Sequence, residues 1–93
     1  MTYPELIDKL ARESTEAFRR EKLIEECAEL ITSLANLVTK GSQIEEVISE
    51  MVDVVMCIDA FNHKLHCRQM YVDRIETKTQ EVAAKLELKK ANG

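Results

Sequence analysis

The sequence predicts an all-α protein, a bundle of four helices in one domain that spans residues 1–93. Its 93 residues include only two Gly and one Pro, which argues against a turn-rich β fold and for long helices. The composition is 45% apolar and 32% charged, which is typical of a folded chain rather than a disordered one. Apolar residues recur at steps of three and four, the spacing of one helix face. Each helix is therefore expected to bury one face in a shared, modest core.

The first two helices are expected at residues 2–12 and 16–40. Thr2 is a candidate N-cap, and Glu5 completes a Thr-x-x-Glu capping box. A cation followed by glycine, Lys40-Gly41, is typical of the end of a helix. The apolar stripe of the second helix consists of Leu23, Ile24, Cys27, Leu30, Ile31, Leu34, Leu37 and Val38.

The third helix is expected to begin at a capping box, Ser42-Gln43-Ile44-Glu45, and to run to about His66. Its apolar residues cover more surface than one neighbouring helix can bury, which indicates a central position, a subunit interface, or both. The fourth helix is expected at residues 69–90. Its inward residues are expected to be Val72, Ile75, Val82 and Leu86.

The charge of the chain is uneven. The net charge is −4 overall; residues 1–67 carry 7 Lys or Arg against 13 Asp or Glu, and residues 68–93 carry 6 against 4. An acidic bulk argues against a nucleic-acid partner, which requires a basic face. The chain could still bind a small polyanion if a divalent cation reversed the local charge.

Several features predict a cytoplasmic protein without a membrane span. No apolar run approaches the roughly 20 residues needed to cross a bilayer, and the polar segment 1–10 does not read as a signal segment. The three cysteines are odd in number and form no CxxC motif, so we expect reduced thiols that serve in packing.

Two acidic pairs are the candidate functional residues. Glu26 and Glu29 on the second helix, and Glu50 and Asp53 on the third, are each spaced i,i+3, which stacks two side chains on one helix face. Glu26 borders the apolar stripe and should be the least solvated glutamate of its run, whereas Glu25 points away from the stripe. If the two helices pack side by side, four carboxylates converge and repel one another unless a cation lies between them. Mg²⁺ prefers oxygen ligands of this kind.

Glutamates on helices are commonly just solvated side chains, and this simpler interpretation stays open. Two details favour a site. Glu50 and Asp53 interrupt an otherwise apolar run, and Glu26 and Glu50 both border the apolar stripes of adjacent helices.

The acidic pattern resembles the signature of a known family. Glu25-Glu26-x-x-Glu29, followed after 20 residues by Glu50-x-x-Asp53, is similar to the motif of the MazG-like nucleotide pyrophosphohydrolases, which belong to the all-α NTP pyrophosphatase superfamily. Lys22, one turn before the glutamates, and the later Ile75-Glu76-Thr77-Lys78 add to the resemblance.

The resemblance implies a fold and an activity. It implies a single MazG-like domain over residues 1–93 that assembles as a homodimer or homotetramer. It implies Mg²⁺-dependent hydrolysis of a nucleoside triphosphate between the α- and β-phosphates, with Mn²⁺ as a possible substitute. The chain has few aromatic residues that could stack on a base, and it lacks the terminal motifs of phosphoribosyl-ATP pyrophosphohydrolase, so the base and sugar preference stays open.

The resemblance also implies a role for each site residue. The metal ligands would be Glu26, Glu29, Glu50 and Asp53. Glu25 and Glu26 would be the catalytic residues that orient or activate a water molecule. The phosphate-binding residues would be Lys22, Arg74 and Lys78. A second hypothesis is a helical adaptor without catalytic activity, since the broad apolar face of the third helix would also suit a protein partner.

Overall fold

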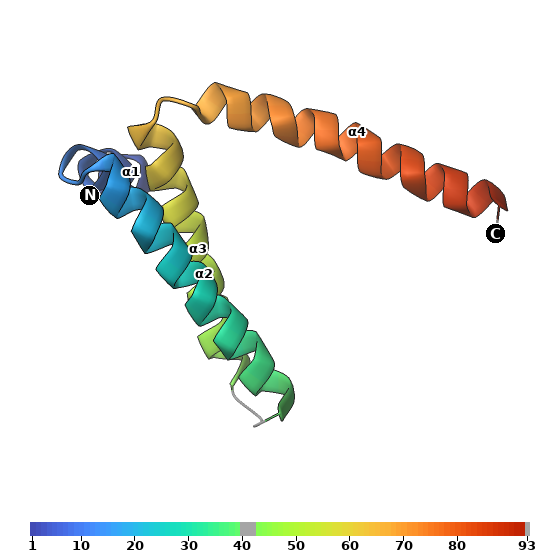
Figure 1. The fold of residues 1–93 in the computed structure, drawn as a ribbon, viewed down its shortest axis with the longest axis horizontal. Coiled ribbons are helices and arrows are strands. Elements are labelled where there is room, and N and C mark those ends of the chain that lie inside the picture. The colour runs from blue at the N-terminus through green and yellow to red at the C-terminus, as the bar shows by residue number, and fades with distance from the viewer. Residues whose placement is uncertain (40–42, 93) are drawn as a thin grey trace.

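The computed structural model describes residues 1–39 and 43–92, and within these ranges the chain forms four helices and no strand. The helices are α1 (Tyr3–Arg12), α2 (Glu16–Thr39), α3 (Ile44–Lys64) and α4 (Arg68–Asn92). The all-α prediction is therefore confirmed. The helix α2 runs alongside α3 as an antiparallel hairpin, α1 crosses the end of that hairpin, and α4 extends away from it (Figure 1).

Threonine side chains cap the N-termini of the first two helices. The Thr2 hydroxyl accepts a hydrogen bond from the Glu5 backbone N–H at 3.3 Å, and the Thr15 hydroxyl accepts one from the Phe18 N–H at 3.0 Å. Both satisfy an N–H group that has no partner inside its helix. The expected signals at residues 40–42 lie outside the described residues, and Gln43 is the N-cap of α3 without a side-chain hydrogen bond.

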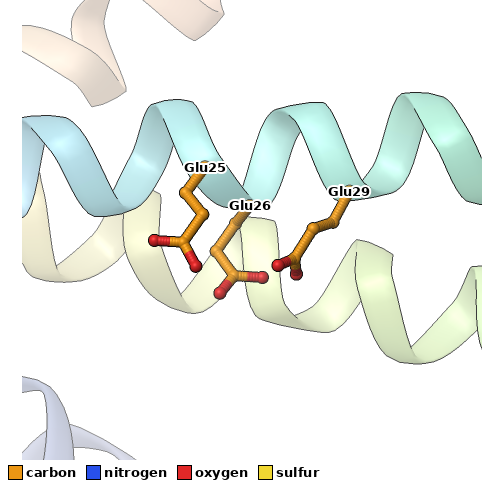
Figure 2. A group of neighbouring side chains, drawn as sticks. All are labelled: Glu25, Glu26 and Glu29. Carbon is orange, nitrogen blue, oxygen red and sulfur yellow. The ribbon is translucent and has the colours of Figure 1, made fainter.

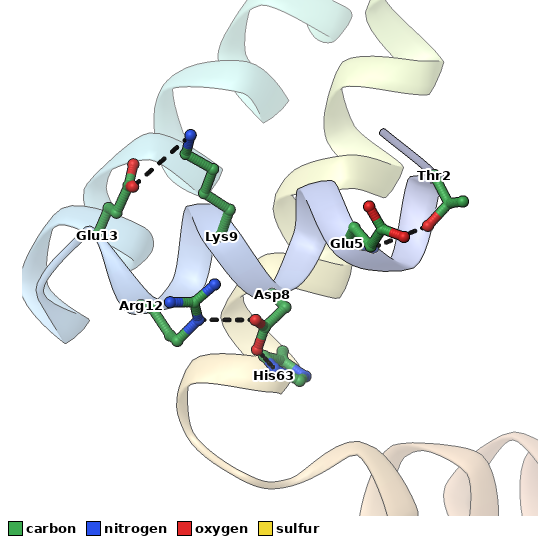
Figure 3. A network of polar contacts seen from close by, with 7 residues as sticks. All are labelled: Thr2, Glu5, Asp8, Lys9, Arg12, Glu13 and His63. Carbon is green, nitrogen blue, oxygen red and sulfur yellow. Dashed lines mark hydrogen bonds and ion pairs between the residues drawn. The ribbon is translucent and has the colours of Figure 1, made fainter.

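The apolar core of the described chain is small. Its buried residues are Ile7 and Ala11 of α1 and Val47, Cys57 and Ala60 of α3. Val47 is in the first turn of α3, whereas α1 contacts α3 near its other end, at Asp59 and His63. Polar contacts also join α1 to α3 (Figure 3). Asp8 of α1 accepts from the Arg12 guanidinium at 2.7 Å and lies 2.9 Å from the His63 ring. The Tyr3 hydroxyl donates to Asp59 at 2.5 Å.

Two backbone hydrogen bonds at the connection to α4 terminate α3. The Cys67 N–H bonds to the Asn62 carbonyl at 3.0 Å and the His66 N–H bonds to the His63 carbonyl at 3.2 Å. These are the two bonds of a Schellman motif, whose turning residue lies in the left-handed region. His66 occupies that position with φ of 55°, although glycine is the usual residue there. The motif stops α3 and sends the chain off in a new direction.

The expected packing of α4 into a four-helix bundle is wrong for the single chain. The helix contacts the rest of the described chain mainly through α3, near their connection, and then projects into solvent (Figure 1). None of its described residues is buried. The residues expected to point inward are 46–62% exposed: Val72, Ile75, Val82 and Leu86. The three-residue connection and its turn point α4 away from the hairpin, so its stripe has no partner within one chain.

Candidate metal centre

The α2–α3 hairpin brings the two acidic pairs together. Glu26 of α2 and Glu50 and Asp53 of α3 each offer a carboxylate oxygen, and these oxygens lie within 4.8 Å of one another. A second group of oxygens within 4.8 Å comprises Glu25, Glu26 and Glu29. Glu26 belongs to both groups and is therefore the centre of the cluster.

Two of these carboxylates each have one buried oxygen without a hydrogen-bond partner among the described residues. Glu26 is 7% exposed, and its Oε2 atom is buried with no hydrogen-bond partner among the described residues. The Oε2 atom of Glu50 is in the same condition. A buried carboxylate oxygen without a donor is costly, and a cation held by these carboxylates would reduce that cost.

The glutamates of α2 differ in exposure as their helix positions predict. Glu26 is buried, whereas Glu25 and Glu29 are exposed. All three extend toward the side of α3, and the carboxylates of Glu26 and Glu29 face each other (Figure 2). Hydrogen bonding with Glu26 and the negative charge of Glu26 raise the pKa of Glu29 above its usual value of 4.5, and the Glu50 charge acts in the same direction. Mutual repulsion therefore extends across both helices.

Lys22 forms ion pairs with two carboxylates of the cluster. Its Nζ atom lies 3.1 Å from Glu26 and 3.5 Å from Glu25, and its hydrogen bond with Glu26 raises the Lys22 pKa. One lysine cannot neutralise the remaining carboxylates, and the Glu26 oxygen opposite the ion pair stays without a donor.

Arg19 is a residue of this centre that sequence analysis did not identify. Arg19 is buried, with 5% of its surface exposed, and its Nε atom has no hydrogen-bond partner among the described residues. Its guanidinium carbon lies 5.0 Å from the centre of the Phe18 ring. Burial raises the pKa of the Cys57 thiol, Glu26 adds to that effect, and Arg19 and Lys22 oppose it. Glu26, Arg19 and Lys22 therefore all act electrostatically on the Cys57 thiol of α3. Arg19 precedes Glu26 by seven residues, about two helical turns, so both lie on one face of α2, and this spacing could have identified Arg19 from the sequence.

The other two expected phosphate-binding residues lie elsewhere. Arg74 and Lys78 are on α4, which leaves the hairpin (Figure 1), and the Lys78 amino group pairs with Glu81 of the same helix at 3.6 Å. Within one chain these cations are not part of the acidic cluster. Their role at the carboxylates stays a prediction, and it requires a second copy of the chain.

A groove extends from the cluster toward the α2–α3 turn. Its volume is about 680 Å³, within the range of ligand sites. Glu25, Glu29 and Glu50 are shared between the groove and the cluster. The other lining residues are the apolar Ala28, the neutral polar Thr32, Ser33, Asn36 and Ser49, and the acidic Glu45 and Glu46.

These features define an all-helical protein with a carboxylate cluster, suited to a divalent cation, beside an open groove. No protein-family model, curated protein or solved structure gives a significant match to the chain. No helix in residues 1–39 and 43–92 combines the length and apolar character that a membrane span requires.

Proposed function

We propose that the protein is a Mg²⁺-dependent hydrolase of nucleoside triphosphates that cleaves between the α- and β-phosphates and releases a monophosphate and pyrophosphate. The observation that carries the proposal is the convergence of Glu26, Glu50 and Asp53 within 4.8 Å, with two buried oxygens unpartnered. The resemblance of the acidic motif to the MazG-like pyrophosphohydrolases supports the same reaction. Mn²⁺ could replace Mg²⁺ because it also takes oxygen ligands.

The donor set fits a hard divalent cation. Glu26, Glu29, Glu50 and Asp53 offer only carboxylate oxygens, and Mg²⁺ is commonly held by a few carboxylates together with substrate phosphates. When bound, such an ion polarises a phosphoryl oxygen and helps to position an attacking water. The opposing charge of the ion would also relieve the repulsion that raises the Glu29 pKa.

The proposed reaction needs a proton acceptor for the attacking water and positive charge beside the phosphates. A water oxygen forms a bond to phosphorus, the bridging P–O bond between the α- and β-phosphates breaks, and its electron pair leaves with pyrophosphate. The water proton passes to a carboxylate, for which Glu25 is suitable because it is exposed beside the buried Glu26. Lys22 and Arg19 offer positive charge to phosphoryl oxygens at the N-terminal side of the cluster.

The direct test is a panel of ribo- and deoxyribonucleoside triphosphates incubated with Mg²⁺, with the products resolved. We expect a monophosphate and pyrophosphate from at least one nucleotide, and no turnover in EDTA. Free phosphate as the product, or no turnover of any nucleotide, would overturn the proposal.

We propose that the working form is a homo-oligomer, because one chain exposes too much surface. Its accessible surface is 7231 Å² for a mass of 10.7 kDa, whereas a compact monomer of that mass exposes about 5,500 Å². Its radius of gyration is 16.8 Å, against about 12 Å for a compact domain of this length. The excess of roughly 1,700 Å² is more than the ~800 Å² that each partner buries in a standard interface.

The exposed apolar residues mark where a second copy would pack. Met51 and Asp53 are about 200° apart around α3, so an apolar face lies opposite the acidic face of the hairpin. The apolar residues of that face are at least 40% exposed: Ile24, Ile31 and Leu34 of α2, and Ile44, Ile48, Met51, Val52 and Val55 of α3. The stripe of α4 adds a second apolar surface, flanked by Arg74 and Lys78.

Light scattering during gel filtration tests the oligomer. Val82→Glu places a charge in the α4 stripe and is expected to lower the molecular mass toward that of one chain. Gln80→Glu adds the same charge on the opposite side of α4 and should leave the mass unchanged. A wild-type protein that elutes as a monomer would overturn this part of the proposal.

The exposed faces also favour a second candidate function, a helical adaptor without catalytic activity. In that case Glu50→Gln would change neither metal affinity nor nucleotide binding, and the apolar face would bind another protein. A loss of metal affinity in Glu50→Gln would argue against the adaptor.

A further inference from the structure

The groove beside the cluster suggests how a nucleotide lies on the hairpin, an inference that rests on the proposed function. The surface has two ends that differ in charge. Arg19 and Lys22 lie on the N-terminal side of Glu26. On the other side is the groove of about 680 Å³, and none of its ten described lining residues is cationic.

Charge decides which end takes the phosphates. Two glutamates at the far end of the groove, Glu45 and Glu46, would repel a triphosphate. The Lys22 amino group would attract it, and the positive charge of the buried Arg19 guanidinium would act in the same direction. The phosphate chain therefore extends from the carboxylate cluster toward Arg19 and Lys22, and the uncharged nucleoside is left for the groove.

The groove offers the hydrogen-bonding groups that a nucleoside needs. The Ser33, Asn36 and Ser49 side chains line it, and none has a hydrogen-bond partner in the described part of the chain. By contrast, the Thr32 hydroxyl is already used, since it donates to the Ala28 carbonyl at 3.1 Å. Only Asn36 among these neutral residues has both an amide donor and a carbonyl acceptor, the combination that matches the edge of a base.

We propose that the nucleoside binds in the groove lined by Ser33, Asn36 and Ser49, with Asn36 as the residue that determines base preference and with the phosphates toward Arg19 and Lys22. The carboxylates of Glu45 and Glu46 can accept hydrogen bonds from sugar hydroxyls or from an exocyclic amino group. The groove thereby supplies selectivity for the nucleoside, whereas the cluster supplies the chemistry.

The test compares Asn36→Leu, which keeps the size of the side chain but removes its amide, with Gln80→Met on α4 as the matched control. Calorimetry with Mg²⁺ measures the affinity for each of four α,β-methylene nucleoside triphosphates, which cannot be cleaved at the proposed bond. We expect Asn36→Leu to lose about tenfold for the nucleotide that the wild type prefers and to flatten the ranking among bases. Its affinity for inorganic tripolyphosphate with Mg²⁺ should stay unchanged, because that probe has no nucleoside.

The opposite pattern is expected for the phosphate end. Lys22→Met should weaken the nucleotides and tripolyphosphate by a similar factor. If the wild type binds nucleotides and Asn36→Leu binds them with the same affinity and ranking, the groove assignment is overturned while the proposed function stands. If the wild type binds no nucleotide, the proposed function fails and the groove assignment fails with it. Helix content by circular dichroism identifies any variant that is misfolded.

Discussion

Two clusters of polar and charged side chains lie between α3 and its neighbours, and they differ in which charges they bring together. At the α1–α3 contact, Asp8 lies between the Arg12 guanidinium at 2.7 Å and the His63 ring at 2.9 Å (Figure 3). At the α2–α3 contact, Glu26 faces Glu50 and Asp53, and the only ion-paired cation beside it is Lys22 among the described residues. The first cluster pairs a carboxylate with a guanidinium and an imidazole, whereas the second gathers carboxylates.

A cluster of charged residues that stabilises the fold differs from a candidate ligand site in the sign of its electrostatic contribution. Opposite charges in contact stabilise the fold modestly, because the pairs are exposed. Like charges that are partly buried oppose folding unless a ligand neutralises them. Removing a charge should therefore weaken the α1–α3 contact but reduce the repulsion at the α2–α3 contact.

The largest expected effect is on turnover. Glu50→Gln and Asp53→Asn each remove a proposed metal ligand. Loss of a residue that only supports a metal ligand can lower activity roughly 100-fold, so loss of a ligand should lower kcat by at least that factor. Both variants should be as stable as the wild type in EDTA, or more stable, because a repelling carboxylate is gone. A pyrophosphate-release assay measures the loss of turnover, and urea unfolding in EDTA measures the stability. A large loss of stability in both variants would contradict the comparison.

Asp8→Asn is the matched control at the α1–α3 contact. It should lower the urea midpoint, since it breaks the contacts with Arg12 and His63, and it should leave the turnover number within about twofold of wild type. A loss of turnover comparable to that of Glu50→Gln would mean that the α1–α3 contact also shapes the site.

The next effect is stabilisation by Mg²⁺. An ion that binds only the folded state at about 100 times its Kd stabilises it by about 2.7 kcal/mol, which is roughly 10 °C or more in Tm for a domain of this size. Glu26→Gln should abolish the shift because Glu26 belongs to both groups of carboxylates. Asp8→Asn should retain it. Differential scanning fluorimetry with and without Mg²⁺ measures the change in Tm. An equal change in Tm for both variants would argue against the proposed site.

The two clusters should also differ in the sign of their pH dependence. The pKa of Asp8 is held below its usual 3.8 by hydrogen bonds with His63 and then Arg12, so its stabilising contribution is present above that pH and is lost as pH falls through the lowered pKa. The pKa of Glu29 is raised above 4.5 by Glu26. The folded state therefore holds the Glu29 proton more tightly, and stability falls as pH rises from 4.5 through the raised pKa.

Urea unfolding between pH 3 and pH 7 in EDTA measures both contributions. Asp8→Asn should flatten the acid side of the stability curve, and Glu29→Gln should remove the decline above pH 4.5. Identical curves for Glu29→Gln and wild type would show that the glutamates do not repel one another in the metal-free protein.

The smallest expected effect is at Tyr3, in the α1–α3 contact. Partial burial and then the hydrogen bond to Asp59 raise the Tyr3 pKa from 10.0 to about 12. The folded state keeps the phenolic proton longer than the unfolded chain does, so stability falls as pH rises from 10 to 12. Tyr3→Phe should lack this decline and lose a small part of the stability at pH 8. Equal slopes above pH 10 for both proteins would show that the hydrogen bond does not persist in solution.

Much of the helical architecture was predictable from local patterns. The N-cap at Thr2 and the start of α2 at Glu16 agree with the sequence prediction, because capping depends on residues three positions apart. The relative burial of Glu25 and Glu26 was predictable for the same reason, since helix periodicity places neighbouring residues on different faces. The turn at His66 was not predictable, because the left-handed position carries histidine instead of glycine.

The candidate site was predictable only in part. The spacing of the acidic pairs indicated which carboxylates share a face, and the structure brings Glu26, Glu50 and Asp53 together. Arg19 was missed because an arginine in a helix is normally exposed, and its burial depends on what α3 places opposite it. The position of Arg74 and Lys78 away from the hairpin also depends on a tertiary feature, the direction of α4.

The helices, their apolar stripes and their acidic faces follow from interactions within one or two turns, so residue order is enough to specify them. Which stripes are covered, which two carboxylate oxygens are buried without partners, and where α4 leaves the hairpin became evident only from the packed helices. Burial and repulsion depend on the register and direction in which helices meet, and a pattern along one helix contains neither.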